Sequence, residues 1–415
     1  MYLLLGYGIA NQAVANFLQK NNLPYIVYDD NVAEYTQLIQ LNNINMIIKS
    51  PGISNEHFLI EQAKILKIPI VTDLEFFYSF YPHKKYITIT GSNGKTTTVT
   101  LTHEILKNAN KKYFLGGNIG IPIFNYSNDD SDLLIEASSF MLEYIKDYHS
   151  YIACILNLTT AHLDHHKTFA NYRKAKQNLF KNQTAQDFVV YNLDDKIVAK
   201  IAKKSKAIKV PFSKTKITNG AYLIGKHLYF QNQYIISLDE IKLLGMHNIE
   251  NILASIAICK ILNIDNEIIR NTIKSFQGIE HRIEYVCQFK NSKVYNDSKS
   301  TNLFALRHAL EAFSSERVLL ICGGKYREDN FSFLDDAIGN VNKVLIFGEN
   351  RNVFLEYFQN KKINAVTFHN LEEVVKYLYE NEVYEEIILF SPGSSSQDQF
   401  KNYEERGRKF KSYMI

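Results

Sequence analysis

The segment best suited to chemistry is GSNGKTT at residues 91–97, which lies between a β-branched run and a helical stretch. Backbone N–H groups of such a loop can surround phosphate oxygens, the lysine can neutralise their charge, and the hydroxyl after it can ligate Mg²⁺. The general pattern GxxxxGK[ST] would place a glycine at Ile89, so the match is incomplete. A purely structural turn is the alternative, but such a turn rarely needs Gly-Lys-Thr at a helix start. The segment therefore predicts use of ATP or GTP.

A second glycine turn, Gly6-Tyr7-Gly8, follows an apolar run at the N-terminus. The dinucleotide pattern GxGxxG would need a glycine where Asn11 stands. Asp29 lies 21 residues after Gly8, where it could accept hydrogen bonds from a ribose or a base. Both a nucleotide site and a tight structural turn fit this pattern.

Acidic and imidazole side chains follow two later apolar runs. Glu136 ends the run LLIE, as an acidic metal ligand beside a phosphate loop would, although an ordinary strand-end acid reads the same way. The segment HLDHH at 162–166 follows another run, and imidazole with carboxylate could bind a divalent ion. A solvated polar loop is the alternative. Zinc is not expected, because nothing nearby in the sequence completes a three-ligand set at recognisable spacing.

Short β-branched runs alternate with amphipathic segments, which indicates strand-helix units and parallel sheets. We expect helices at about 11–20, 99–107 and 248–262. The expected strands are 2–5, 25–28, 85–90, 133–136, 151–156, 317–322, 343–347, 365–368 and 386–390. The pattern predicts an α/β protein of three domains: a Rossmann-like domain at 1–83, a central P-loop ATPase-type domain with a mainly parallel sheet at 84–278, and a C-terminal Rossmann-like domain at 279–415.

Composition excludes several classes of protein. The chain has 415 residues, 46% of them hydrophobic, so bulk disorder is excluded, and its net charge of +4 is too weak to imply nucleic acid. No apolar run reaches the ~18 residues that a membrane span needs, and the N-terminus lacks a basic flank and a cleavage site, so we expect a cytoplasmic monomer without a membrane partner. The four cysteines stand singly in apolar stretches and are expected to be buried, reduced thiols.

A series of further segments carries a resemblance to a known family. They occur in the family's order and cover all three expected domains. The segments are GSNGKTTT (91–98), GGNIG (116–120), EASSF (136–140), LNLTTAHLDHH (156–166), NYRKAKQNLF (171–180), GMHNIEN (245–251), GIEHRIEYV (278–286), NDSKSTN (296–302), CGGKYRE (322–328) and SPGSSSQDQFKNYEERGRKF (391–410). Together they resemble the Mur ligases, and the C-terminal third narrows the resemblance to members that add D-glutamate to UDP-N-acetylmuramoyl-L-alanine.

The resemblance implies an ATP site and two Mg²⁺ ions. The residues implied to surround ATP are Gly91, Ser92, Asn93, Gly94, Lys95, Thr96, Thr97, Asn248, Asn251, Arg282 and Asp297. Among these, the two asparagines would meet the adenine. Thr96 and Glu136 would hold one Mg²⁺ ion, and His162 and Lys176 the second. In the family, a lysine at the position of Lys176 is carbamylated by CO₂, which turns a cation into a carboxylate-like ligand. An ordinary solvated helix lysine is the alternative.

The resemblance also implies where the other two substrates bind. The residues implied to contact the UDP-sugar are Gly8, Ile9, Ala10, Asp29, Ser50, Gly52, Asn118 and Ser139. Those implied for D-glutamate are Lys299, Thr301, Arg327, Ser396 and Tyr403. The residues implied in catalysis are Lys95, Glu136, His162, Lys176 and Lys299.

Two residues depart from the family pattern. Arg327 stands in GGKYREDNF where the family commonly has lysine, and its guanidinium could hold the glutamate side-chain carboxylate through two hydrogen bonds. Met141 changes the family's SSFQL to SSFML and removes an amide that would be available to substrate. Two other functions stay open. One is an amide ligase for diaminopimelate, lysine or a folate glutamyl tail, and the other is a catalytically silent regulator that binds a nucleotide sugar.

Overall fold

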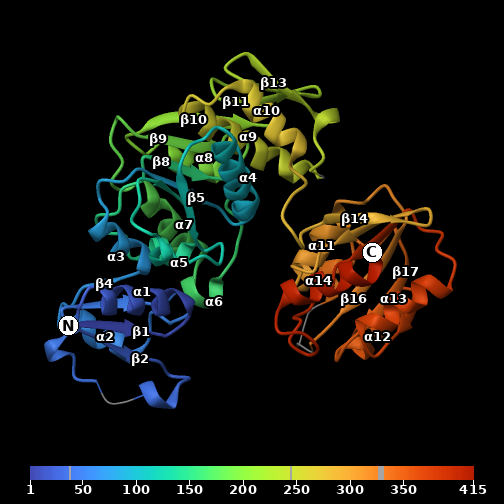
Figure 1. The fold of residues 1–415 in the computed structure, drawn as a ribbon, viewed down its shortest axis with the longest axis horizontal. Helices are drawn as coiled ribbons and strands as arrows, with labels where there is room; N and C mark the ends of the chain where they lie inside the picture. The colour runs from blue at the N-terminus through green and yellow to red at the C-terminus, as the bar shows by residue number, and fades with distance from the viewer. Residues whose placement is uncertain (37–38, 244, 326–330) are drawn as a thin grey trace. The chain divides into compact units, whose positions relative to one another are not determined.

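The computed structural model describes residues 1–36, 39–243, 245–325 and 331–415. These residues form two compact units, each seen in Figure 1. The first unit comprises Met1–Ile241 and His247–Phe276, and the second comprises Lys242–Met246 and Gln277–Ile415. Among the described residues the strands form three sheets, two in the first unit and one in the second. The expected α/β fold class is therefore confirmed, whereas the three domain boundaries stay predictions.

The N-terminal sheet is parallel and has the order β2-β1-β3-β4. Its elements are β1 (Tyr2–Leu5), α1 (Ile9–Lys20), β2 (Tyr25–Tyr28), η1 (Ala33–Tyr35), η2 (Leu41–Asn43), β3 (Met46–Lys49), α2 (Phe58–Ile65), β4 (Ile70–Val71) and α3 (Asp73–Phe80). Because β1 lies between β2 and β3, the chain changes direction across the sheet at β1. Ligands of open α/β sheets bind at such a point, beyond the carboxyl ends of the strands.

The central sheet has the order β13-β12-β11-β10-β9-β8-β5-β7-β6. Its elements are β5 (Tyr86–Thr90), α4 (Lys95–Asn108), β6 (Tyr113–Gly117), η3 (Ile123–Asn125), β7 (Asp132–Glu136), α5 (Ser139–Glu143), β8 (Ile152–Ile155), α6 (Leu163–His166), α7 (Phe169–Gln177), η4 (Asn178–Phe180), β9 (Phe188–Asn192), α8 (Lys196–Ala202), β10 (Ile208–Ser213), β11 (Ala221–Ile224), β12 (His227–Phe230), β13 (Gln233–Ser237), η5 (Leu238–Glu240), α9 (Met246–Ile261) and α10 (Asn266–Ser275). The strands β6 to β11 pair in parallel, and β12 and β13 extend the sheet by antiparallel pairing.

Helices cover both faces of the central sheet. On one face Tyr86 of β5 joins a core that contains residues of α5 and α7. Side chains alternate along a strand, so Ile87 and Ile89 face the other way. There α4 packs against β5, β6 and β7, as Figure 1 shows. All residues of β5 are buried, and the hydroxyls of its two threonines form hydrogen bonds with Tyr148 and with the Ala137 carbonyl oxygen.

The sheet of the second unit has the order β14-β15-β19-β16-β17-β18. Its elements are β14 (Glu284–Phe289), β15 (Ser292–Asn296), α11 (Leu303–Glu311), β16 (Val318–Gly323), η6 (Phe331–Leu334), β17 (Val341–Phe347), α12 (Arg351–Asn360), β18 (Asn364–Thr367), α13 (Leu371–Glu380), β19 (Ile387–Phe390) and α14 (Tyr403–Met414). Only β14 pairs antiparallel among these described strands. Because β16 lies between β19 and β17, the loops after β16 and β19 meet at one edge.

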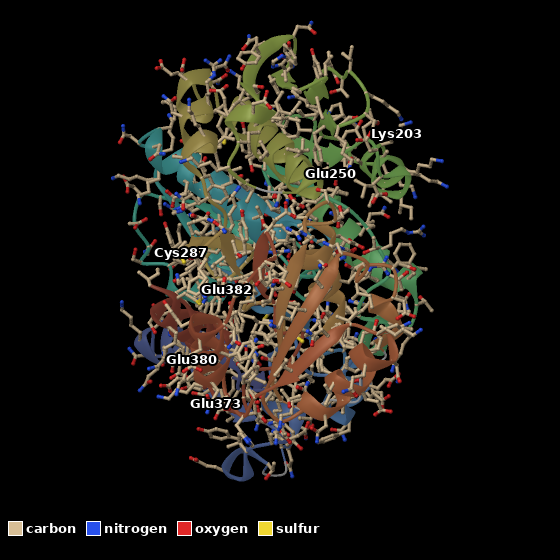
Figure 2. The ribbon with its side chains drawn as sticks, turned by 90° about the vertical axis from the view of Figure 1, so that its right-hand side faces the viewer. Lys203, Glu250, Cys287, Glu373, Glu380 and Glu382 are labelled. Atoms are coloured by element: carbon tan, nitrogen blue, oxygen red, sulfur yellow. The ribbon has the colours of Figure 1, made fainter. Side chains whose placement is uncertain are left out.

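Some expectations differ from the structure in detail. Strands 2–5 and 25–28 are confirmed at both ends, but the helix expected at 99–107 begins four residues earlier, at Lys95. The antiparallel extension β11 to β13 and the hairpin β14-β15 were not expected. All four cysteines are free, as expected, but Cys287 on β14 is partly exposed, so its expected burial was wrong (Figure 2). No helix in the described ranges has the length and apolar character for crossing a membrane.

A buried glutamate joins α3 to the central part of the first unit. Glu75 is 5% exposed, and its carboxylate accepts three hydrogen bonds from the backbone N–H groups of residues 146–148, over 2.7–3.0 Å. Phe76 and Phe77 beside it pack edge-on or tilted against Phe124 of η3. The N-terminal sheet is thereby attached to the central sheet through both polar and aromatic contacts.

We expect Glu75→Ala to lower the free energy of unfolding of the first unit by roughly 2–4 kcal/mol, because three backbone N–H groups lose a buried, charged acceptor. Urea unfolding followed by circular dichroism measures this. Glu61→Ala on α2 is the control, since Glu61 is exposed. A difference below about 0.5 kcal/mol between the two variants would show that Glu75 is not needed at this junction.

Candidate active site

The segment GSNGKTT follows β5, and β5 lies between β7 and β8 in the central sheet. Glu136 ends β7, and Asn157 follows β8 closely. The carboxyl ends of neighbouring parallel strands meet at one edge, so these three segments come together. The sheet thus builds one cluster from segments that are separated by at least 21 positions in the sequence.

Asn157 holds the phosphate-type loop through hydrogen bonds. It lies in the segment 156–166, but no role was predicted for it. The side chain of Asn157 accepts from Asn93 N over 2.8 Å and donates to Asn93 O over 3.2 Å. The Ser92 hydroxyl lies 2.8 Å from the Tyr172 hydroxyl. Gly94, with φ of +82°, caps α4 at its N-terminus. Its left-handed backbone allows the loop to turn directly into the helix.

Two lysine side chains converge on this loop. Lys95 Nζ donates to the carbonyl oxygens of Gly91 and Ser92 over 2.9 and 3.0 Å. Lys176 Nζ donates to the same Gly91 oxygen over 3.0 Å and to Thr90 Oγ1 over 3.1 Å. Lys176 is 1% exposed, so the alternative of a solvated helix lysine is wrong. Burial and the charge of Lys95 lower the pKa of Lys176 well below its usual value, against the opposing effect of Glu136.

Glu136 is buried beside these lysines. Its Oε1 accepts a hydrogen bond of 2.8 Å from the side chain of Asn118, so the structure brings these two predicted residues together. Its Oε2 is buried and has no hydrogen-bond partner among the described residues. An unsatisfied buried carboxylate oxygen is costly, and a bound cation would satisfy it. Glu136 therefore fits the predicted role of metal ligand.

His162 and Ser139 lie on neighbouring short helices of this region. His162 is exposed and caps α6 with φ of +53°, a backbone conformation that non-glycine residues rarely adopt. Its ring centroid lies 5.0 Å from that of Phe140. Ser139 begins α5, and its hydroxyl lies 2.9 Å from His166 Nε2. Ser139 is thus already engaged with an imidazole that had no predicted role of its own.

The two asparagines predicted for adenine lie on α9, against the first turn of α4. Asn251 Nδ2 donates to Asn248 Oδ1 over 2.8 Å, and Asn251 Oδ1 accepts from Thr98 Oγ1 over 3.3 Å. Glu250, labelled in Figure 2, forms an ion pair of 2.7 Å with Lys214. These contacts fix α9 against the phosphate-type loop and against the end of β10.

In the turn after β1, Asn11 stands where the dinucleotide pattern would have a glycine, and its contacts explain why. Asn11 is fully buried, and its side-chain amide donates to the carbonyl oxygens of Leu5, Gly6 and Ile48 over 2.7–3.3 Å. Asp29 accepts from Tyr7 N over 2.6 Å. An asparagine at this position therefore ties the turn to β3, which a glycine could not do.

The residues predicted to bind the UDP-sugar gather at this turn. Gly8, Ile9 and Ala10 form the start of α1, and the side chain of Ile9 is 69% exposed. Ser50 follows β3, and a Cβ atom on Gly8 would lie 3.7 Å from its hydroxyl. Gly52 has open space around it.

The second unit holds the remaining predicted residues. Asp297 is buried, accepts from Ser391 Oγ over 2.7 Å, and its burial raises its pKa from 3.8 to about 7. The neighbouring Arg282 charge opposes this shift. Lys299 Nζ lies 5.7 Å from the ring centroid of Tyr403. Thr301 is partly exposed.

The loop after β19 is clamped by an arginine that sequence reasoning missed. Ser396 in this loop is 3% exposed. Arg406 is fully buried and donates to the carbonyl oxygens of Ser394 and Ser298 over 2.9 and 2.8 Å. Burial lowers the pKa of Arg406 to about 9. In the sequence, the indication of a role for Arg406 was its position in segment 391–410, which resembles the Mur ligases. The prediction on Arg327 falls outside the described residues.

Comparison with known proteins defines the class first. Residues 89–259 match the model of the Mur ligase middle domain. The fold is similar to UDP-N-acetylmuramate-alanine ligase from Thermotoga maritima, with a TM-score of 0.64 and 20% identity over 99% of this chain and 97% of that one. It is also similar to the MurF ligase from Thermotoga maritima in complex with ADP, with a TM-score of 0.60 and 16% identity over 100% and 94% of the two chains. These likenesses show the fold of Mur ligases.

Sequence relatives narrow the class. A UDP-N-acetylmuramoylalanine–D-glutamate ligase from Bacillus mycoides is 40% identical over 88% of this chain and 82% of its own. A protein of the same name from Bacillus cereus strain AH820 is 38% identical over 98% and 95% of the two chains. The chain therefore belongs to the Mur ligase family, and within it to the UDP-N-acetylmuramoylalanine–D-glutamate ligases. The expectation of a ligase enzyme is confirmed.

We expect Gly94→Ala to weaken binding of a non-hydrolysable ATP analogue at least about tenfold, as measured by calorimetry. A Cβ atom there would overlap Asn251 Oδ1, and the left-handed backbone adds about 1–2 kcal/mol of strain. Gly225→Ala is the control: Gly225 has φ of +57° but nothing within 4 Å of the added atom. Equal affinity in the two variants would contradict a role for the close approach of Gly94 and Asn251.

Proposed function

We propose that this chain joins D-glutamate to UDP-N-acetylmuramoyl-L-alanine with ATP as the energy source, during synthesis of the peptidoglycan precursor. The observation that carries the proposal is the cluster of Lys95, Lys176 and Glu136 at the Gly91 loop, in which Lys176 and Glu136 are buried and Lys95 is partly exposed. It is supported by the names of relatives that are 38–40% identical over most of the chain. The enzyme is proposed to act in the cytoplasm as a monomer.

The chemical difficulty is that a carboxylate is a poor electrophile in water. In the proposed reaction, an oxygen of the L-alanyl carboxylate attacks the γ-phosphorus of ATP, which forms an acyl phosphate and releases ADP. The neutral amine of D-glutamate then attacks the acyl carbon, the C–O bond to phosphate breaks and releases inorganic phosphate, and the nitrogen loses one proton to that phosphate or to water as the amide forms. Lys95 and the backbone N–H groups of the Gly91 loop offset the charge of the phosphates.

We propose that the site holds two Mg²⁺ ions, as the family resemblance implies. Thr96 and Glu136 are proposed to hold one ion, and His162 and Lys176 the other. The unsatisfied Oε2 of Glu136 supports the first assignment. When bound, such ions stabilise negative charge on the transferred phosphoryl group. Glu136 is in turn oriented by Asn118, so the carboxylate keeps one direction without a ligand.

Lys176 fits the carbamylated lysine of the family. Only an uncharged amine can attack CO₂, and burial lowers the pKa of Lys176 toward that form. When the N–C bond to CO₂ forms, the nitrogen loses one proton to solvent. The resulting carbamate gives Lys176 a negative charge. The ammonium group of Lys176 donates to the Thr90 hydroxyl and the Gly91 carbonyl oxygen, and neither acceptor is an anion whose ion pair the change would break.

The other substrates are proposed to bind in the N-terminal sheet and the second unit. The turn of Gly8 to Ala10, with Asp29, Ser50 and Gly52, is proposed to hold the UDP-sugar, with Asn118 and Ser139 nearer its muramoyl part. Lys299, Thr301, Ser396 and Tyr403 are proposed to form the D-glutamate pocket with Arg327. Arg282 and Asp297 are proposed to lie at the ATP phosphate and ribose region. The exposed start of α1 supports the first of these assignments.

Phosphate release with a panel of amino acids tests the proposed substrate. With UDP-N-acetylmuramoyl-L-alanine and ATP, we expect D-glutamate to support turnover at least about 100-fold faster than L-glutamate, lysine or meso-diaminopimelate. Equal turnover with any of these would overturn the assignment in favour of a different amide ligase. Nucleotide-sugar binding without any ADP release would instead favour the silent regulator.

Lys176→Ala tests the carbamate. We expect it to lower the turnover number by about 100-fold or more, with partial recovery on adding acetate, which can take the place of the lost carboxylate-like group. Lys174→Ala, on the same helix but exposed, is the matched control. It should keep the parent turnover number and show no increase on adding acetate. In ¹³C-bicarbonate, a carbamate resonance should be present in Lys174→Ala and absent in Lys176→Ala. A fully active Lys176→Ala variant would remove this residue from the mechanism.

A further inference from the structure

Three potential metal ligands meet in the first unit, apart from the residues assigned to Mg²⁺. They are Glu143 at the end of α5 and His165 and His166 in α6, and their ligand atoms all lie within 4.8 Å of one another. Zinc was not expected from the sequence, because no third ligand stands near the histidines along the chain. That expectation overlooked Glu143, which lies 22 residues before His165 and reaches it only through the fold.

The three ligand atoms lie near enough for side-chain rotation to bring them around one ion. Glu143 Oε2 lies 2.9 Å from His165 Nε2, and Glu143 Oε1 lies 3.9 Å from His166 Nδ1. Two ligands on a tetrahedral zinc ion, each about 2.1 Å from it, are about 3.4 Å apart. The two observed distances run to different oxygens of Glu143, so the carboxylate must rotate to bring one oxygen to the ion together with both imidazoles.

His166 gives an independent indication of a missing partner. Its side chain is 1% exposed, and Nδ1 has no hydrogen-bond partner among the described residues. Its other nitrogen, Nε2, lies 2.9 Å from the Ser139 hydroxyl, an outer contact of the kind that orients metal-ligating histidines. When Nε2 carries the proton, the Nδ1 lone pair faces the carboxylate of Glu143, and two acceptors then face each other. A cation between them satisfies both.

The cluster is accessible and has room for a further ligand. It lines a cavity of about 330 Å³, whose wall also contains Asn55 and Lys167. Lys167 pairs with Glu56 over 3.2 Å, which offsets its charge. Asn55 donates to Glu143 Oε1 over 2.6 Å and must turn to admit an ion. The Tyr144 hydroxyl, 2.8 Å from Asn55 Oδ1, can donate or accept, so it can satisfy the amide in either orientation.

We propose that Glu143, His165 and His166 bind one zinc-class transition-metal ion, with water from the cavity in the fourth position. Two imidazoles with one carboxylate suit Zn²⁺, whereas Mg²⁺ prefers oxygen ligands throughout. The ion joins α5 to α6. It is distinct from the two proposed Mg²⁺ ions, because none of its three ligands is assigned to them.

Calorimetric titration of the metal-free full chain with Zn²⁺ in excess Mg²⁺ tests the site. We expect one strongly bound ion and a raised midpoint of thermal unfolding. Glu143→Gln and His165→Gln should each weaken zinc binding at least about tenfold and abolish the thermal shift. His149→Gln is the matched control, because His149 forms a similar pair with Asp187 over 2.8 Å in the same unit. It should keep the parent affinity.

A second variant and a spectrum separate this site from other sites. His162→Gln should keep zinc affinity, since His162 is not a ligand here; loss of binding in His162→Gln with retention in Glu143→Gln would overturn the proposal. Co²⁺ bound to the parent chain should give the visible absorption of a tetrahedral nitrogen and oxygen site. Thiolate charge-transfer absorption, or no Co²⁺ binding, would equally overturn it. This spectrum is recorded on the parent chain, so it decides the matter even if a variant fails to fold.

Discussion

The carbonyl oxygen of Gly91 accepts hydrogen bonds from two lysine side chains at once. The rest of the active site depends on what offsets the repulsion between these two positive charges. Lys95 and Lys176 each lie within 3.0 Å of it. Two ammonium groups this close repel each other, and burial weakens their hydration. Glu136 offsets part of this cost, and the lowered pKa of Lys176 relieves the remainder. A carbamate on Lys176 would convert the repulsion by Lys95 into attraction.

In each sheet a polar side chain holds a loop that follows one of the strands near the point where the strand order reverses. Asn11 holds the turn after β1, Asn157 holds the loop after β5, and Arg406 holds the loop after β19. A loop that offers backbone N–H groups to a ligand cannot also satisfy itself through regular pairing. The side-chain clamps keep such loops in one conformation before a ligand arrives, which reduces the entropy that binding must remove.

Sequence patterns predict the buried parallel strands well, because short runs of apolar and β-branched residues, such as that of β5, are typical of buried strands. They miss the start of α4, where Lys95 and three threonines resemble a loop until Gly94 is seen to cap the helix. They also leave Lys176 undecided between solvent and site, since α7 is polar apart from a few positions. Pairings across the fold, such as Glu136 with Asn118 or Glu143 with His165, require knowledge of which strand ends are neighbours.

The position of His162 is set by residues that take no part in its proposed role. It begins α6, which spans only Leu163–His166, and a helix this short is not stable by itself. Its own positive φ adds strain that the surroundings must offset. Those surroundings are the pair of His165 with Glu143 and the contact of His166 with Ser139. The orientation of a proposed Mg²⁺ ligand therefore depends on the histidines beside it, and any interaction that strengthens their hold on α5 also fixes His162.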